Sequence, residues 1–508
     1  MSHVQGTCPG RTVVGIVRLM SFGQVSSGSF LPANPRIQGE NALVLVVLDP
    51  LSTVSYHATK WYSFRRPLDQ AEWNTIRSYT RRVRSILDFG SAFHPDCVRN
   101  FLNPSSPEPL FPNLRYLRCV FANEVTPLLH QPLPSLISLD YLFVFEGNLS
   151  LLRESLESFP GASTKMKQLC IRVHQPEAIF DKLVSDYICR WSDPQNVYCP
   201  QIALDIKALT HLSRIPGLTQ LTFALSANIT TPCDTLFFST LQELRLFSES
   251  LTPIPKLIVH TQLHAVMNFS VEIGSYPSRQ SITSFFTALR PSVNCDTITR
   301  LRLTQIHHSF SVPRLVPLVL FADDLMPSTA LRNLRHLDLN LGWSVGLTDR
   351  QLLDLASAWP HLEHLLINEE WGWQTAGGIT PDGLVRLLQT CRSLTRVALA
   401  VDTRGYTAVH VPPLRFPVSL AVDPSISSSP SPSFSINVVD SVIETAAVPA
   451  MAAFFANVVP YSRFSLTAWG SWAFTWRMNK GMYVDQWSNV YVRAKEAIAQ
   501  RSDISVPC

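Results

Sequence analysis

The sequence has little charge, since Asp, Glu, Lys and Arg make up only 16% of it, while 46% of its residues are hydrophobic. This balance is typical of a folded protein. The net charge of +4 is spread over 508 residues without a dense basic block. Charge therefore gives no reason to expect nucleic acid or an anionic membrane surface as a partner.

Long apolar runs are also missing. The run from Thr445 to Pro460 is interrupted by Pro449, and the earlier runs, Thr12 to Met20 and Ala42 to Leu48, are too short to cross a bilayer. Neither of these early runs has the order of segments found in a signal peptide. We expect no membrane span and predict a buried helix within Thr445 to Pro460.

Paired cysteines are absent as well. Ten cysteines lie at irregular intervals without any Cys-x-x-Cys, and the closest two, Cys189 and Cys199, are too isolated to form half of a zinc site. In a chain of this length the pattern indicates reduced thiols, several of them in the core. We expect a cytoplasmic or nuclear protein, and a secreted disulfide-bonded protein is the alternative.

The spacings that catalysis imposes do not occur either. We find no GxSxG, no HExxH, no Walker phosphate loop and no strand-linked GxGxxG. His260 and His264 are four residues apart, but Pro255 and β-branched neighbours argue against one continuous helix, and no third ligand is evident. Asp323 and Asp324 are interpreted as a helix start or loop pair. We therefore expect a protein that is not an enzyme and that has no cofactor or metal.

The sequence does contain a recurring Leu-x-x-Leu-x-Leu segment. Its last two apolar positions are two apart, as in a strand, and the first lies three residues earlier. Copies recur at intervals centred near the roughly 20 to 29 residues of leucine-rich repeats. Clear copies begin at Leu114, Leu136, Leu218, Leu241, Ile298, Leu334, Leu362 and Leu394, and weaker copies lie near Met166, Ile202 and Ile436.

Helical periodicity appears between these copies. Phe180–Tyr187, Ile282–Leu289 and Leu384–Cys391 each have apolar residues at i, i+3, i+4 and i+7. Thr348 begins a capping-box pattern, and Thr380 precedes a proline, which is well tolerated in the first turn of a helix. We predict an α/β leucine-rich-repeat solenoid, with a curved parallel sheet on the concave side and helices on the convex side.

The pattern suggests four segments. Residues 1–50 lack periodicity and are expected to be poorly ordered, while 51–110 should form an N-terminal helical cap. Residues 111–460 should hold the irregular repeats, with a Ser/Pro loop at 424–433, and 461–508 a C-terminal cap.

Apolar stripes predict one helix in each cap. The first stripe runs from Asp69 to Leu87, and the arginines on its other face, Arg77, Arg81 and Arg84, are interpreted as a solvated face, although an acidic partner is the alternative. The second stripe runs from Trp487 to Ile498 and should close the final unit.

Several stretches resemble a large fungal family of F-box proteins with leucine-rich repeats. They include RPLDQAEWNTIRSYTRRVRSI (66–86), FPNLRYLRC (111–119), LRNLRHLDLN (331–340) and LTDRQLLDLASAWPHLEHLLI (347–367). The resemblance spans roughly residues 55 to 500. It implies that an F-box would dock on the Skp adaptor of a cullin ubiquitin ligase while the repeats select a protein substrate.

The sequence departs from that family at the F-box itself. The early candidate, Leu31-Pro32, runs into Pro35 and Gly39, which cannot continue a helix. We therefore interpret residues 1–50 as a remnant or a replacement of an F-box. Skp adaptor and cullin are expected partners only if an F-box is present.

The candidate binding residues follow from the repeat register. Side chains between the buried strand leucines should line the concave face, and acidic and aromatic residues after one strand should form a loop at its rim. The alternative for the two tryptophans is packing beneath their own loop. The strand residues are Arg245, Arg302, His336, Asp338 and Arg396, and the loop residues are Glu369, Glu370, Trp371 and Trp373.

These features predict a solenoid that recognises another protein. One hypothesis is the substrate-recognition subunit of an SCF-type ubiquitin ligase. The alternative is a scaffold or regulatory leucine-rich-repeat protein unconnected with ubiquitin.

Overall fold

The structure is a computed structural model. It describes residues 51–56, 59–64, 69–86, 109–119, 133–143, 153, 156, 166–173, 178–229, 231–306, 318–374, 378–407, 434–459, 464–470 and 480–504. The expectations for residues 1–50, including Leu31-Pro32, and for the Ser/Pro loop at 424–433 lie outside these residues. The chain divides into two compact units, residues 1–224 and 225–508, which we call the first and second units.

Fourteen of the described strands form a parallel sheet, in which the strand order follows the chain order. In the first unit they are β3 (Ser85–Ile86), β4 (Tyr116–Cys119), β5 (Ser138–Phe143), β6 (Gln168–Val173), β7 (Asn196–Ala203) and β8 (Gln220–Leu225). In the second unit they are β10 (Glu243–Ser248), β12 (Asn268–Ile273), β13 (Arg300–Gln305), β15 (His336–Asn340), β17 (His364–Ile367), β18 (Arg396–Ala398), β19 (Phe434–Asn437) and β20 (Phe464–Thr467).

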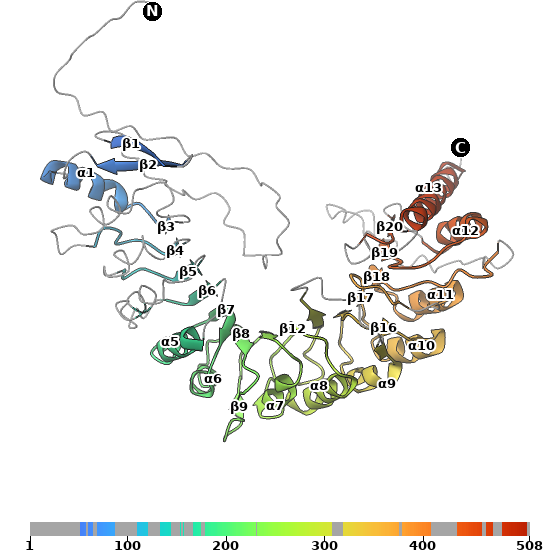
Figure 1. The fold of residues 1–508 in the computed structure, drawn as a ribbon, viewed down its shortest axis with the longest axis horizontal. Coiled ribbons are helices and arrows are strands. Elements are labelled where there is room, and N and C mark those ends of the chain that lie inside the picture. The colour runs from blue at the N-terminus through green and yellow to red at the C-terminus, as the bar shows by residue number, and fades with distance from the viewer. Residues whose placement is uncertain are drawn as a thin grey trace, which may run out of the picture. The chain divides into compact units, whose positions relative to one another are not determined.

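Helices alternate with these strands. The first unit contains α1 (Gln70–Thr80), α5 (Ala178–Ile188) and α6 (Ile206–Ser213). The second contains α7 (Pro253–Ile258), α8 (Arg279–Ser292), α9 (Ala322–Leu325), α10 (Asp349–Ser357), α11 (Pro381–Thr390), α12 (Val448–Val458) and α13 (Lys480–Ile504). In the second unit the described helices lie along one side of the sheet, and none of them covers its other side (Figure 1).

Two short 3-10 helices, Met326–Ala330 and Thr445–Ala447, and several short strand pairs are also present. Three pairs stand apart from the main sheet, and the first of them is antiparallel. They are β1 (Leu51–Tyr56) with β2 (Thr59–Phe64), β9 (Leu236–Phe237) with β11 (Thr261–Gln262), and β14 (Val319–Leu320) with β16 (Ser344–Val345). The solenoid prediction is confirmed by the parallel sheet and its interleaved helices.

The repeated leucines form ladders inside the fold. Leu337 lies opposite Leu301 on one neighbouring strand and Leu365 on the other, and each of the three is at most 1% exposed. Burying a leucine stabilises a fold by roughly 1.5 to 3 kcal/mol. Because a single repeat cannot cover its own apolar face, this stabilisation depends on stacking of neighbouring repeats.

The helix signals in the sequence also match the structure. Thr348 and Gln351 form a reciprocal capping box at the start of α10, and the Thr380 hydroxyl accepts a hydrogen bond from the Gly383 N–H. The side chains of Ile282, Phe285, Phe286 and Leu289 on α8 are all buried, as their spacing predicts. Local sequence therefore determines where these helices begin and which face they bury.

The helix predicted from Asp69 to Leu87 is shorter than expected. α1 ends at Thr80, and Ser85–Ile86 forms strand β3 in the sheet. Val83 is 2% exposed and so is buried outside the helix that its spacing suggested. Residues 51–56 and 59–64 form a strand pair, so the segment expected to be a helical cap contains both kinds of structure.

Three sheet strands, β3, β12 and β20, were missed in the sequence, and the repeat copy near Ile202 was displaced, because β7 places Val197 in the ladder and Ile206 begins α6. β12 buries Phe269 and Val271, and β20 buries Phe464 and Leu466 at the ladder positions. A search for leucine overlooks β12 because phenylalanine and valine replace it there. Since β3 precedes residue 111 and β20 follows residue 460, the sheet reaches beyond the expected range of 111–460.

The apolar segment from Thr445 to Pro460 holds the buried helix that was predicted. α12 packs against α13 and buries Met451, Phe454 and Phe455. In the described part of the chain, no helix combines the length and the hydropathy that crossing a membrane requires.

Candidate functional site

The side of the second unit's sheet that no described helix covers presents two rows of residues, which we call the open face. Successive residues of a strand point to opposite sides, so these residues alternate with the buried ladder. The register aligns Glu243, Asn268, Arg300, His336, His364, Arg396 and Ser435 as the first row, and Arg245, Ser270, Arg302, Asp338, Leu366, Ala398 and Asn437 as the second.

An ion pair occupies the middle of the second row. The Arg302 Nε lies 3.1 Å from a carboxylate oxygen of Asp338, whose side chain is 26% exposed. Burial raises the pKa of Asp338 to about 6, although the positive charge of Arg302 opposes this shift. Glu369 and Glu370 raise the same pKa further. The pair is therefore partly shielded from water and close to additional negative charge.

Two histidines meet in the first row. The rings of His336 and His364 lie edge to face with centroids 4.2 Å apart, and His336 Nε2 is 3.5 Å from the Glu363 carboxylate. Burial, followed by the neighbouring His364, lowers the pKa of His336 to about 4. Burial also lowers the pKa of His364. Both rings are consequently neutral at pH 7.

A second arginine, Arg396 of the first row, forms an ion pair with the loop that follows β17. Nη2 of Arg396 lies 3.0 Å from each carboxylate oxygen of Glu369, and the Asn437 side-chain amide donates to Glu369 over 3.3 Å. The Glu370 N–H donates to the Asn340 side chain over 3.1 Å. Glu369 and Glu370 are thereby held at the edge of the open face.

The loop that follows β17 turns through a left-handed residue. Asn368 has φ of 54° and is 1% exposed. Its side chain accepts a hydrogen bond from the Leu341 N–H over 2.8 Å and donates to the Trp343 carbonyl over 2.6 Å. Asparagine tolerates this backbone region better than most residues, and these bonds hold the turn in place.

Trp373 was expected on the rim of the binding surface, and the structure corrects this. It is completely buried, and its indole N–H donates to the Ile367 carbonyl over 2.9 Å. Its backbone N–H donates to the Asp440 carboxylate over 2.7 Å, and that of Gln374 does so over 2.9 Å. Trp373 therefore packs beneath its own loop, which was the alternative, and offers no surface to a partner.

Trp371 remains partly exposed beside the open face. Its ring centroid lies 6.2 Å from that of Tyr276, which follows β12. Gly342 lies beneath this contact, since a Cβ there would collide with the Tyr276 ring. The absence of a side chain at Gly342 thus makes room for the aromatic pair.

The predicted residues are not gathered at a single point. Arg302, Asp338, His336, Arg396, Glu369, Glu370 and Trp371 lie on or beside strands β13 to β18, whereas Arg245 lies on β10 and pairs with Glu243 at 2.7 Å. Glu272 separates the two groups on β12, and burial raises its pKa against the opposing charges of Arg302 and Arg245.

Sequence reasoning missed several neighbours of this site, among them Arg300, His364, Tyr276 and Glu363. Arg300 and His364 could have been found, because the strand register that selected Arg302 and His336 places them in the first row. Tyr276 and Glu363 gave no such signal, because both lie outside the strands. Among the described residues, no group of three His, Cys, Asp or Glu is placed to hold a metal ion.

The alternation of ladder strands and helices defines the fold class of this chain, which is a leucine-rich-repeat solenoid. No protein-family model matches the sequence, and no curated protein matches it either.

Solved structures similar to this chain include an internalin from Listeria monocytogenes, with 11% identity, a TM-score of 0.30, and coverage of 65% of this chain and 88% of that one. The Rad7 and Elc1 complex from yeast matches with 14% identity, a TM-score of 0.29, and coverage of 57% and 78%. LegL7 from Legionella pneumophila matches with 12% identity, a TM-score of 0.29, and coverage of 63% and 93%. The similarity concerns the repeat fold, which the strand order shows independently.

Proposed function

We propose that this chain recognises another protein, and that the open face of the second unit, together with Trp371 and Tyr276 at its edge, is the binding surface. The observation that supports this most strongly is the composition of that face. Half-exposed arginines and an aromatic pair lie side by side there, and arginine, tryptophan and tyrosine are the residues enriched at interaction hot spots.

The charged side chains of this face already form ion pairs with one another before any partner binds. Arg302 contacts Asp338 and Arg396 contacts Glu369, so the side chains hold fixed positions before a partner arrives. A surface that is already ordered loses less conformational entropy on binding. Because both signs of charge alternate along the face, we expect its partner to carry both signs as well, rather than a single block of one charge.

Site-specific photo-crosslinking tests the surface. A photoreactive residue placed at Ser270 on the open face should capture the partner, while the same residue at Asp354 on α10 should not. Trp371→Ala and Arg302→Ala should each reduce capture at Ser270 about tenfold, since removing a hot-spot side chain typically costs 1 to 2 kcal/mol or more. Arg386→Ala, an exposed arginine on α11, is the matched control. Equal capture from all three variants would contradict the proposed surface.

A narrower form of the proposal makes this chain the substrate-recognition subunit of a ligase built on a Skp adaptor and a cullin. Its support is the resemblance of several sequence stretches to F-box proteins with leucine-rich repeats. The alternative is a scaffold or regulatory protein unconnected with ubiquitin. Binding without catalysis is proposed in both forms.

Quantitative affinity purification separates the two forms. Recovery of the Skp adaptor and cullin together with the open-face partner supports the ligase subunit. Recovery of the open-face partner from Skp- and cullin-free eluates supports the scaffold. The Arg302→Ala variant should lose the partner but keep any adaptor, because the adaptor would bind elsewhere on the chain.

A further inference from the structure

The middle of the first row brings an arginine and two histidines together on the open face. Arg300, His336 and His364 lie side by side in the register of β13, β15 and β17, and we call them the basic cluster. The two rings are 4.2 Å apart between centroids, and Arg300 is close enough to lower the pKa of both. Since neighbouring strands are roughly 4.8 Å apart, the cluster spans about 10 Å.

The charged groups around the basic cluster leave one positive charge without a counter-charge. Nη1 of Arg335 lies 2.8 Å from the Glu363 carboxylate, and Nη2 of Arg396 lies 3.0 Å from that of Glu369. Arg300 is exposed, and its guanidinium forms no ion pair or hydrogen bond with any other described residue. A negative group brought by a partner would therefore meet an uncompensated cation there.

His336 can add a second positive charge when such a group arrives. Its side chain is 23% exposed, so a ligand can reach it. Burial, followed by the nearby His364 and Arg300, lowers its pKa to about 4. Glu363 opposes this shift, and Arg335 reinforces it. The ring is thus kept neutral mainly by burial and by other positive groups, and a carboxylate within roughly 4 to 6 Å would favour its protonated form.

The same balance applies to His364. Burial, followed by the charge of Arg396, lowers its pKa, while Glu363 opposes the shift and Arg300 reinforces it. An anion placed between the arginines and the rings would oppose these positive charges. Binding of an anion should therefore be accompanied by proton uptake at the cluster.

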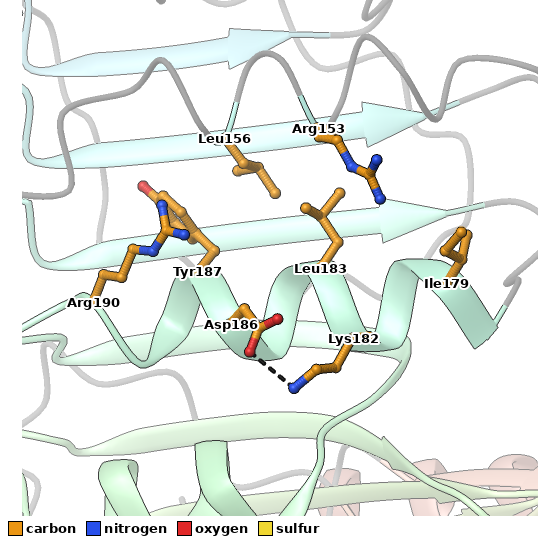
Figure 2. A pocket seen from close by; sticks show the side chains of 8 residues that line it. All are labelled: Arg153, Leu156, Ile179, Lys182, Leu183, Asp186, Tyr187 and Arg190. Atoms are coloured by element: carbon orange, nitrogen blue, oxygen red, sulfur yellow. Dashed lines mark hydrogen bonds and ion pairs between the residues drawn. The ribbon is translucent and has the colours of Figure 1, made fainter.

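The pocket beside α5 in the first unit, which measures about 170 Å³, shows no comparable convergence. Arg153 and Arg190 lie at its opposite ends, with Leu183 between them (Figure 2). The ammonium of Lys182 lies 2.9 Å from the Asp186 carboxylate, so these two charges compensate each other. The open face therefore offers the better site for an anionic group.

We propose that the basic cluster binds a short acidic segment of the protein partner, with carboxylates against Arg300, His336 and His364. This inference rests on the proposed function, because it names the chemistry by which the partner would contact the first row. Two acidic residues at alternate positions of an extended segment are roughly 7 Å apart, which lies within the span of the cluster. The segment covers only part of the open face, so the partner as a whole still carries both signs of charge.

NMR titration of labelled histidine rings in the full chain tests the cluster directly. Without a ligand, Arg300→Gln should raise the pKa of His336 and of His364, because it removes a positive charge that lowers both. A saturating acetylated and amidated tetraglutamate peptide should raise the pKa of His336 from about 4 to at least about 5. Tetraglutamine has the same length without the charge and should leave both pKa values unchanged.

Isothermal titration calorimetry at pH 6 measures the affinity for the same peptides. Tetraglutamate should bind at least about tenfold more tightly than tetraglutamine, and Arg300→Gln should weaken its binding about fivefold, because a charge-assisted contact is lost. Arg214→Gln changes an exposed arginine three residues after His211 at the end of α6, away from the open face. It is the matched control and should bind tetraglutamate like the parent.

The inference is wrong if tetraglutamate binds no more tightly than tetraglutamine, if Arg300→Gln binds it like the parent, or if the bound peptide leaves the pKa of His336 unchanged. If photo-capture at Ser270 still depends on Trp371 and Arg302 in that case, the open face remains the binding surface and only the acidic segment is refuted. If tetraglutamate binds as expected while capture at Ser270 is independent of Trp371 and Arg302, the proposed surface is refuted instead.

Discussion

The two units have the same buried ladder but differ in the charge of the first row beside it. In the first unit the row equivalent to the charged first row is neutral, and Asn196 donates a side-chain hydrogen bond to Gln220 over 2.6 Å. Its members are Tyr116, Ser138, Gln168, Asn196 and Gln220. The second unit places arginine, histidine and glutamate at these positions.

This difference shows which positions the fold constrains. In both units the ladder needs an apolar residue at every second strand position, because those side chains are enclosed by neighbouring repeats. Most of the alternate positions contact solvent and tolerate either neutral or charged residues, whereas Leu366 and Ala398 of the second row are buried. One scaffold can therefore carry a charged first row in one unit and a neutral first row in the other, while an Arg–Asp ion pair lies in the second row of both, Arg118 with Asp140 and Arg302 with Asp338.

The largest loss of stability is expected in the buried ladder, which both units share. Leu117→Asp in the first unit and Leu337→Asp in the second should each destabilise the protein by at least about 4 kcal/mol, because each buries an unpaired carboxylate in the ladder. Chemical denaturation followed by circular dichroism measures this. If either variant unfolded at the parental denaturant concentration, the shared ladder would be refuted in that unit.

A smaller effect is expected at the loop that follows β17 in the second unit. Asp440 is 8% exposed and accepts the N–H groups of Trp373 and Gln374. Asp440→Ala should destabilise the protein by about 2 to 3 kcal/mol, because charge-assisted hydrogen bonds are lost and two donors are left buried. Hydrogen exchange should rise at residues 371–374. Unchanged protection there would show that Asp440 does not hold the loop.

The pH dependence of stability should reveal the shifted pKa values of Asp338 and His336 on the open face. The raised pKa of Asp338, about 6, means that the fold binds its proton more tightly than the unfolded chain, so this group lowers stability as pH rises from about 4 to 6. The lowered pKa of His336, about 4, has the opposite sign, so this group raises stability as pH rises from about 4 to 6.5.

The opposite effects of Asp338 and His336 on the pH dependence of stability should nearly cancel in the parent protein. In a variant that lacks one of the two groups, the effect of the other should be visible alone. Asp338→Asn should leave stability rising with pH in that range, and His336→Gln should leave it falling, each by about 1 kcal/mol because both side chains touch solvent. Denaturation midpoints between pH 4 and 7 measure this. Parallel pH profiles for the two variants would contradict the assignment.

The smallest effect on stability should come from exchanging the exposed rows. Gln168→Arg in the first unit and Arg300→Gln in the second should each change stability by less than about 0.5 kcal/mol, because both positions contact solvent. Only Arg300→Gln should weaken partner capture at the open face. A loss of stability in either variant, measured by thermal unfolding, would mean that the exposed rows also serve the fold.

Local sequence largely predicted whether a segment forms a helix or a strand, but it did not predict where every element ends. The capping residues before α10 and α11 act within one turn, so Thr348 and Thr380 were correctly identified. α1 ends earlier than its apolar spacing suggested, because Ser85 and Ile86 pair with Tyr116 and Leu117 on another strand. That pairing overrides the local helical pattern.

The candidate site was predictable only in part. The register identified Arg302, His336, Asp338 and Arg396 as residues of the face, since they alternate with buried leucines. It could not distinguish Trp371 from Trp373, because the turn at Asn368 and the carboxylate of Asp440 decide which tryptophan is buried.

The sequence by itself determined that strands and helices alternate and that the strands bury every second residue, because these periods are properties of neighbouring residues. Only the tertiary structure decided that Arg302 meets Asp338, that the His336 and His364 rings touch, and that Trp373 leaves the surface. These contacts join residues of different repeats, and their distances follow from how the repeats stack, which no local pattern encodes.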